Sequence, residues 1–236
     1  MTLLAALLLA PLLGSFAALA ADRLAEGRGI VTGRSRCDGC GRALAPRDLV
    51  PILSFLALRG QARCCGAPVP RHLPLVEAAF LIVPVTAALA GAPLMTSCAL
   101  GWTLAALAAI DLRTLRLPDA LTLPLLLAGL ALSAAGATGP LGLHAAGAAV
   151  GAGIVVAADA AYRALRGVPG MGMGDAKLLA AAGAWCGLAA LPPVLLLACL
   201  LGLAAALSSG AGPRTPVPFG PALAAAFWLV WLVPLP

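Results

Sequence analysis

Long apolar runs separated by short polar segments make up most of the chain. Most of these runs have the length of a membrane-spanning helix, and none shows the alternation of apolar and polar residues in ten-residue units that an outer-membrane barrel requires. The pattern predicts eight helices, at 3–20, 73–91, 94–112, 119–137, 141–160, 177–190, 191–208 and 218–234. The sixth is short and meets the seventh at Leu191-Pro192-Pro193, where we expect a kinked or re-entrant element.

The composition excludes an ordinary water-soluble domain. Of 236 residues, 62% are hydrophobic and 10% are charged, whereas soluble domains carry about 25% charged residues. The predicted fold is all-α: a polytopic helical membrane bundle of about eight transmembrane helices with a small cytoplasmic, cysteine-containing loop domain. We expect a first transmembrane helix at 1–20, the cytoplasmic loop at 21–72 and the remaining bundle at 73–236.

The basic residues predict how the helices are oriented. With the N-terminus outside the cytoplasm, the segments 21–72, 113–118, 161–176 and 209–217 face inward, and every Lys and Arg lies on or beside that face. The positions of the residues behind the net charge of +6 are therefore explained by the orientation of the helices in the membrane, and we expect no nucleic-acid site. The alternative of a cleaved signal, suggested by Ala18-Leu19-Ala20, lacks a basic N-terminal region and would place the arginines of 21–72 on the wrong side.

Four cysteines mark the polar loop as a candidate metal site. Cys37 and Cys40 have the two-residue spacing of a zinc knuckle, and Cys64 and Cys65 follow after a gap. A segment this small cannot bury a large core, and neighbouring thiolates in a reducing compartment commonly bind zinc. Because the second pair is adjacent, tetrahedral ligation by both sulfurs is harder, so free thiols remain the alternative.

Two aspartates stand out among the nine acidic residues, because an ionisable group near the bilayer core is costly. Asp111 closes the apolar run 104–110 at the C-terminal end of a helix, where the helix dipole disfavours negative charge; pairing with Arg113 or Arg116 is the alternative. Asp175 follows the glycine-rich segment 170–174 and opens the sixth helix, where it could also be an N-cap.

Three other acidic residues have different interpretations. Asp119 follows Pro118 at a helix start and favours a structural capping role, and Asp159 lies four residues before Arg163 and favours a local ion pair. Glu77 lies inside the second helix near its cytoplasmic end, too far from the terminus to be a cap. It is therefore a functional candidate.

The predicted topology brings Asp111 and Asp175 to the same depth. The first ends an inward-going helix and the second begins an outward-going one, so both are expected at the cytoplasmic face. Two carboxylates in a partly dry site do not both ionise easily. Such a pair suits peptide hydrolysis, because the ionised member takes a proton from water while the protonated member polarises the scissile carbonyl.

Several motifs in order along nearly the whole chain resemble those of the bacterial prepilin peptidases. They are Gly14-Ser15-Phe16, the segment from Cys37 to Cys65 with Arg63-Cys64-Cys65-Gly66-Ala67-Pro68, Pro74-Leu75-Val76-Glu77, Ile110-Asp111 through Leu117-Pro118-Asp119, Gly172-Met173-Gly174-Asp175-Ala176-Lys177 and Pro218-Phe219-Gly220-Pro221. A lone Gly-x-Gly-Asp is a weak signal, but this conjunction is highly specific.

The resemblance implies an intramembrane aspartyl endopeptidase of the bacterial inner membrane. It would remove the leader of type IV prepilins and type II secretion pseudopilins at the cytoplasmic face, with Asp111 and Asp175 catalytic. Many members also methylate the new amino terminus with S-adenosylmethionine, using regions that include the N-terminal loop, and Glu77 could help to receive that cofactor or the amine. The second cysteine pair lacks the family's two-residue spacer. This chain therefore departs from the family pattern in the loop that the resemblance links to Zn²⁺ binding and methylation.

Three other functions remain open from the sequence. The carboxylates could couple proton or cation movement in a transporter, although we find no matched pair of broken helices in two halves. The chain could be a peptidase without methyltransferase activity, or a noncatalytic scaffold that binds pilin helices through small-residue surfaces.

Overall fold

A computed structural model describes residues 2–29, 35–167, 170, 172–210 and 217–233. Over these ranges the regular structure is helical, and strand-like pairing is limited to two isolated β-bridges. The all-α prediction is confirmed. The chain divides into two compact units, Met1–Thr114 (unit 1) and Leu115–Pro236 (unit 2).

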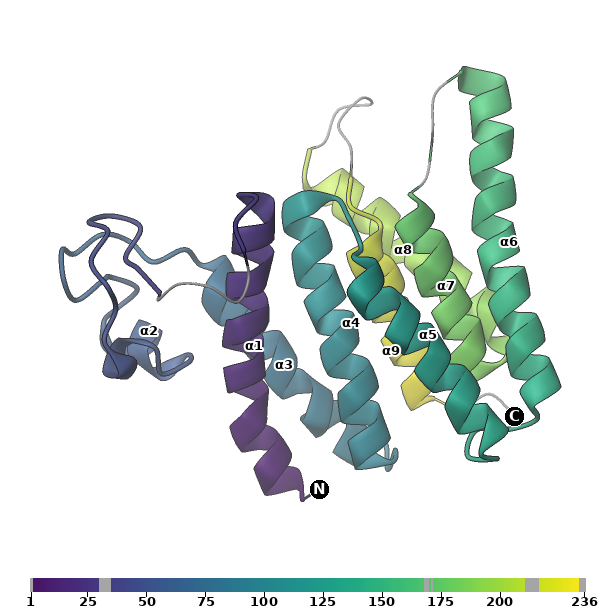
Figure 1. Ribbon diagram of the computed structural model, residues 1–236, viewed down its shortest axis with the longest axis horizontal. Helices are drawn as coiled ribbons and strands as arrows, with labels where there is room; N and C mark the ends of the chain where they lie inside the picture. The colour runs from purple at the N-terminus through teal and green to yellow at the C-terminus, as the bar shows by residue number, and fades with distance from the viewer. Residues whose placement is uncertain (1, 30–34, 168–169, 171, 211–216, 234–236) are drawn as a thin grey trace. The chain divides into compact units, whose positions relative to one another are not determined.

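Unit 1 consists of three long helices and a polar loop segment (Figure 1). The helices are α1 (Leu3–Ala25), α3 (His72–Leu89) and α4 (Leu94–Thr114). The segment between α1 and α3 carries a 3-10 turn, Pro46–Asp48, and the short helix α2 (Leu53–Ala57). Figure 1 shows α1 and α4 side by side, and both pack against α3.

A stripe of small residues lets α1 pack closely against its neighbours. Ala6, Ala10, Gly14, Ala17 and Ala21 recur at helical spacing and are all buried. A Cβ at Gly14 would lie 2.8 Å from the Cα of Glu77 on α3, so glycine is required at this contact. Helices that meet in lipid gain mainly from such close packing, because burying apolar groups from lipid gains little.

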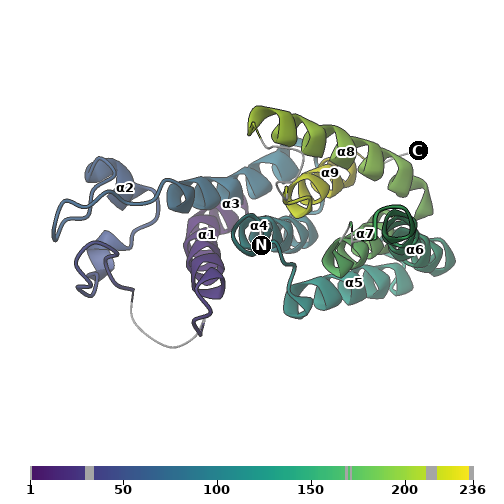
Figure 2. The ribbon, with the colours of Figure 1, turned by 90° about the horizontal axis from the view of Figure 1, so that it is seen from above.

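Unit 2 contains the remaining five long helices. They are α5 (Asp119–Ala134), α6 (Leu141–Arg166), α7 (Met173–Cys186), α8 (Leu191–Ser208) and α9 (Gly220–Leu232). Helix α7 lies between α5 and α6, and α9 packs against α7 and α8 (Figure 2).

Helix α7 is the core of unit 2. Its residues from Leu178 to Trp185 are all buried. The Trp185 indole N–H donates to the Leu125 carbonyl at 2.7 Å, and its ring meets Trp231 edge to face at 5.5 Å. On the other side, Gly183 packs against Gly147 of α6 so closely that a Cβ at Gly183 would lie 2.2 Å from backbone atoms.

The described helices match the eight predicted runs but differ from them in length. Five have the length and apolar composition to cross a membrane: Leu3–Ala25, His72–Leu89, Leu94–Thr114, Leu141–Arg166 and Leu188–Ser208. The other three, α5, α7 and α9, have 16, 14 and 13 residues. At about 1.5 Å per residue, a 14-residue helix rises about 21 Å, less than the ~30 Å hydrocarbon core.

The ends of α7 differ from the predicted ends. The helix begins at Met173 rather than 177, because Gly172 already takes the N-cap conformation. It ends at Cys186, where Gly187 has a φ of 81°, and a 3-10 turn at Leu188–Ala190 leads into α8. The break therefore lies at Gly187, and Pro192 and Pro193 belong to the first turn of α8, where proline is tolerated.

The Gly147–Gly183 contact leads to a stability prediction. We expect Gly183→Ala to destabilise the detergent-solubilised protein by about 1–3 kcal/mol, because the added methyl overlaps the α6 backbone. The matched control is Gly153→Ala on α6, where a Cβ meets no atom within 4 Å. Equilibrium unfolding in mixed micelles measures both variants, and an equal effect of the two would contradict the packing argument.

Candidate active site and cysteine cluster

Asp111 lies in the last turn of α4, in unit 1. Its side chain is buried, with 5% exposure, and Leu107 and Ile110 of the same helix are buried with it. The dipole of α4 is unfavourable for a negative charge at this end, as the sequence indicated. A buried acid in such a position is costly to keep for packing alone.

Asp175 lies at the third position of α7, in unit 2, and is half-buried. The N-cap is Gly172, and it makes no side-chain capping bond. The expectation that Asp175 could itself be the N-cap is therefore wrong, because the helix starts two residues before it. Its carboxylate instead lies in the first turn, where the dipole favours negative charge.

The glycine-rich segment before Asp175 is fixed at two described points. At Gly170, the backbone N–H donates to Asp159 Oδ1 at 2.8 Å, and a Cβ there would lie 2.5 Å from the Tyr162 ring. At Gly174, a Cβ would lie 2.8 Å from Leu117 Cβ. Met171, also part of this motif, lies outside the described residues. Close backbone approach on both sides explains why the motif uses glycine.

Asp159 has the local ion pair that the sequence favoured, whereas the capping role expected of Asp119 is wrong. The Asp159 carboxylate is buried and accepts from Arg163 Nε at 2.6 Å in addition to Gly170. Asp119 is the first residue of α5, makes no capping bond, and forms an ion pair with Lys177 of α7. These contacts join the first turns of α5 and α7 and the last turns of α6, so they hold the segment that carries Asp175.

Glu77, the third candidate, is buried on α3, with 6% exposure. Its Oε2 accepts the backbone N–H of Ile52 at 2.7 Å, and Ile52 has a φ of 58°, unusual for a β-branched residue. No basic side chain lies within ion-pair distance of Glu77 in the described part of unit 1. Glu77 therefore holds the polar loop on α3.

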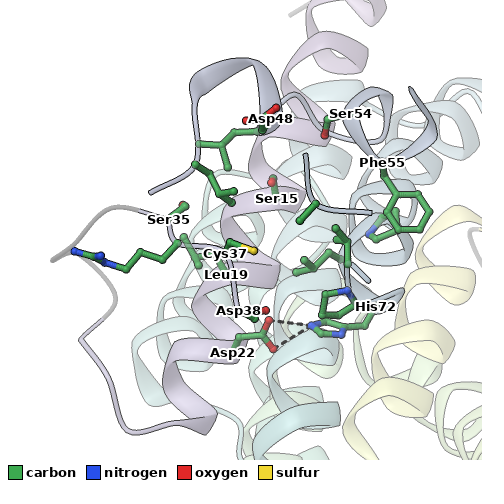
Figure 3. A pocket seen from close by; sticks show the side chains of 18 of the residues that line it. Ser15, Leu19, Asp22, Ser35, Cys37, Asp38, Asp48, Ser54, Phe55 and His72 are labelled. Atoms are coloured by element: carbon green, nitrogen blue, oxygen red, sulfur yellow. Dashed lines mark hydrogen bonds and ion pairs between the residues drawn. The ribbon is translucent and has the colours of Figure 1, made fainter. Parts of the chain in front are cut away.

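A cavity of about 390 Å³ lies in unit 1 between the polar loop and the helices (Figure 3). Its wall includes Glu77, the aromatic ring of Phe55 and the polar-loop residues Cys37 and Gly39. It also includes Asp22 and His72, which sequence reasoning did not single out. The sequence could have pointed to both residues by their position, because each is a titratable residue close to the point where a helix meets the polar loop.

The four loop cysteines lie together. Their sulfur atoms are all within 4.8 Å of one another. Cys37 Sγ lies 3.6 Å from Cys65 Sγ, Cys40 Sγ lies 3.4 Å from Cys64 Sγ, and the adjacent pair is 3.9 Å apart. The difficulty expected from the adjacency of Cys64 and Cys65 is therefore absent, because each sulfur faces a different cysteine of the first pair.

Two matching hairpins explain how the cysteines meet. The first closes with an Arg36–Ala43 bridge and the second with a Gln61–Pro68 bridge. In the first, the Cys37 N–H donates to Arg42 O at 2.9 Å and the Gly41 N–H to Cys37 O at 2.8 Å. In the second, the Ala62 N–H donates to Ala67 O and the Gly66 N–H donates to Ala62 O, both at 2.8 Å, so Ala62 makes the same two bonds as Cys37.

By this correspondence Cys65 matches Cys40, Ala62 matches Cys37, and Cys64 matches Gly39. Gly39 lies against the opposite hairpin, since a Cβ there would lie 2.5 Å from Ala67 Cβ and 3.3 Å from Cys65 Sγ. The equivalent position in the second hairpin is Cys64, whose sulfur reaches Cys40. Cys64 thus supplies the thiol that Ala62 lacks.

The thiols differ in how readily they ionise. Backbone N–H groups of Cys40 and Gly39, with a further hydrogen bond from Cys64, lower the pKa of Cys37 to about 7. Hydrogen bonds with the Cys40 and Cys37 sulfurs raise the pKa of Cys64 to about 12. Cys37 therefore ionises more readily than Cys64.

Known proteins resemble both parts of the chain. A sequence model described as the type IV leader peptidase family matches residues 98–207, and one described as the bacterial peptidase A24 N-terminal domain matches residues 8–90. A prepilin leader peptidase/N-methyltransferase of Aeromonas hydrophila is 41% identical over 206 residues, which cover 84% of this chain and 71% of the relative. The chain belongs to the type IV leader peptidase family.

Other relatives with the same name agree with this membership. The Klebsiella pneumoniae protein is 41% identical over 183 residues, 74% of this chain and 78% of the relative. The Burkholderia pseudomallei (strain 1026b) protein is 42% identical over 205 residues, 81% and 64% respectively. No solved structure matches the chain. Family membership makes the chain a peptidase, and it decides against the transporter and scaffold interpretations.

Proposed function

We propose that the chain is an aspartyl endopeptidase of the bacterial inner membrane that removes the leader of type IV prepilins and type II secretion pseudopilins. The observation that carries the proposal is the 41% identity, over 84% of the chain, to a prepilin leader peptidase/N-methyltransferase. Asp111 and Asp175 are the proposed catalytic pair. Asp111 is buried at a helix end, and Asp175 follows a glycine motif held at two points.

The proposed chemistry needs the two carboxylates to share one proton. The ionised aspartate removes a proton from the attacking water while the protonated one donates a hydrogen bond to the scissile carbonyl. The proton then passes to the leaving amine, and the pair returns to its starting state. Because the two groups titrate together, the shared proton belongs to the pair rather than to either residue.

The membrane supplies part of the specificity in this proposal. A prepilin has a basic leader followed by an apolar helix, so the helix can stay in lipid while the scissile bond reaches the cytoplasmic level. The cytoplasmic face is supported by the basic residues of the predicted inward segments, among them Arg113, Arg116 and Arg163. Arg34 and Arg214, which also belong to the predicted inward segments, lie outside the described residues.

The aspartate pair yields a direct test. We expect Asp111→Asn and Asp175→Asn each to lower the rate of leader removal by at least about 10³-fold, because an amide cannot accept or supply the shared proton. Cleavage of a prepilin is followed by gel shift and mass spectrometry with the full chain in proteoliposomes. Glu26→Gln, which alters an exposed acid paired with Arg28, is the matched control. Full cleavage by either aspartate variant would refute the pair.

For the cysteine cluster we propose a structural Zn²⁺. A tetrahedral site with Zn–S bonds of about 2.3 Å has sulfur–sulfur edges of about 3.8 Å, and three pairs in the structure are 3.4, 3.6 and 3.9 Å apart. Cys37, Cys40, Cys64 and Cys65 would hold the ion. It would join the two hairpins of a loop that has little apolar core of its own.

The hairpin correspondence yields the second test. We expect Cys64→Ser to lose bound zinc, and the double variant Ala62→Cys with Cys64→Ala to retain it, because position 62 matches Cys37. Zinc per chain is measured by atomic emission after removal of loosely bound metal. The control is Cys199→Ser, an exposed cysteine of α8 outside the cluster. Zinc content unchanged by Cys64→Ser would contradict the proposed ligand set.

We further propose that the enzyme methylates the new amino terminus with S-adenosylmethionine bound in the unit 1 cavity. The cavity volume of about 390 Å³ lies within the usual range of about 300–1,000 Å³ for small-molecule sites. Phe55 offers a face for a flat base, and Glu77 offers a negative charge for the sulfonium or for the new amine. When bound, the cofactor would supply an electrophilic methyl group.

The variant Glu77→Gln tests the charge of Glu77 separately from its structural bond to Ile52. The Gln carbonyl can still accept the Ile52 N–H, so we expect leader removal to remain while S-adenosylmethionine binds at least about tenfold more weakly, since a charge-assisted contact contributes about 1.5–3 kcal/mol. Isothermal titration of the reconstituted full chain gives the affinity. An unchanged cofactor affinity with a raised KM for methylation of the processed pilin would show that Glu77 binds the new amino terminus of the pilin rather than the cofactor. Parent-like values for both would refute a role in binding.

A further inference from the structure

Three helices of unit 1 meet at the carboxylate of Asp22. Asp22 Oδ1 and Oδ2 lie 3.0 and 2.9 Å from Nε2 of His72, the first residue of α3. The same carboxylate accepts from Arg113 Nε of α4 at 2.9 Å. Figure 3 shows the Asp22–His72 contact at the cavity wall.

This arrangement defines which ring nitrogen of His72 presents a hydrogen to Asp22. The carboxylate accepts both from Arg113 Nε and from the imidazole, so Nε2–H is the donor in their contact. In that tautomer Nδ1 has a free lone pair and is a base. An aspartate that fixes one ring nitrogen so that the other can accept a proton is a recurring arrangement in enzymes.

The second nitrogen of His72 is available for chemistry. Within the described residues Nδ1 makes no hydrogen bond, and the His72 side chain is 33% exposed. The residue lines the same cavity as Glu77 and Phe55. Asp22 from α1 and Arg113 from α4 are the charged groups that face it through their shared contact.

We propose that His72 is the proton acceptor for methyl transfer in this cavity, with Asp22 as its positioning residue. The proposal rests on the methylation function proposed above. In the step, His72 Nδ1 would first take a proton from the protonated amine of the processed pilin and pass it to water. The freed nitrogen would then form a bond to the methyl carbon of the bound cofactor as its carbon–sulfur bond breaks, which leaves S-adenosylhomocysteine and the methylated amine in its ammonium form.

Several other polar groups of the cavity are less suited to this step. Arginine side chains are permanently protonated and cannot accept a proton. Glu26 and Asp48 are held in ion pairs with Arg28 and Arg63. Glu77 has one oxygen bonded to Ile52, and its charge is better used to attract the cation than to remove its proton. An α-amino group has a pKa of about 7.7–8.0 in general, so a nearby base speeds its reaction at neutral pH.

The experiment uses His72→Gln in the full chain in proteoliposomes. The Gln amide can donate to Asp22, as Nε2 does, but it has no basic nitrogen. We expect unchanged leader removal, unchanged affinity for S-adenosylmethionine by titration calorimetry, and methylation of the processed pilin slower by about five- to tenfold at pH 7, where only about 10–20% of such an amine is unprotonated without a base. The deficit should shrink above pH ~8, where the amine loses its proton without help.

A second variant tests the same role of His72 by chemical rescue, without relying on the behaviour of the Gln side chain. His72→Ala opens space beside Asp22, and added imidazole should restore part of its methylation rate without altering its cleavage rate. Parent-like methylation by His72→Gln across the pH range would overturn the proposal. So would a loss of cofactor affinity in His72→Gln, which would make His72 a binding group. A parent chain that neither binds S-adenosylmethionine nor methylates pilin would instead refute the methylation function itself.

Discussion

The cost of placing a carboxylate at the end of an apolar helix constrains much of this structure. Such a charge is expensive near lipid unless hydrogen bonds or an opposite charge compensate it. Asp22 is compensated by His72 and Arg113, Asp159 by Arg163 and the Gly170 N–H, and Asp119 by Lys177. Each of these acids also joins two or more segments, so the same compensation that reduces the cost holds the polar ends of the helices in place.

Glu77 follows the same rule only in part. It has a backbone donor at Ile52 but no cation among the described neighbours. The bond also holds Ile52 in a backbone conformation that costs about 1–3 kcal/mol in general. The polar loop is thus attached to α3 through a carboxylate that also lines the unit 1 cavity.

Much of the helical architecture could be predicted from the sequence, because apolar runs and flanking arginines follow directly from the physics of the bilayer. The ends of α7 could not, since Gly172 and Gly187 set them through backbone conformations that hydrophobicity does not report. Asp111 and Asp175 could be singled out from the sequence because acidic residues are rare in such a chain. The joint role of Asp22 and His72 was not, because their meeting depends on how α1 packs against α3 through small residues such as Gly14.

The paired hairpins of the loop carry a consequence for how such clusters diverge. Because positions 39 and 64 both face the opposite hairpin, and positions 37 and 62 begin equivalent turns, a thiol can shift between neighbouring sites while the group of four sulfurs persists. Drift of this kind erases the spacing by which a pattern search finds metal-binding loops. The same geometry lets a chain with irregular cysteine intervals bring four sulfurs together, as Cys37, Cys40, Cys64 and Cys65 do here.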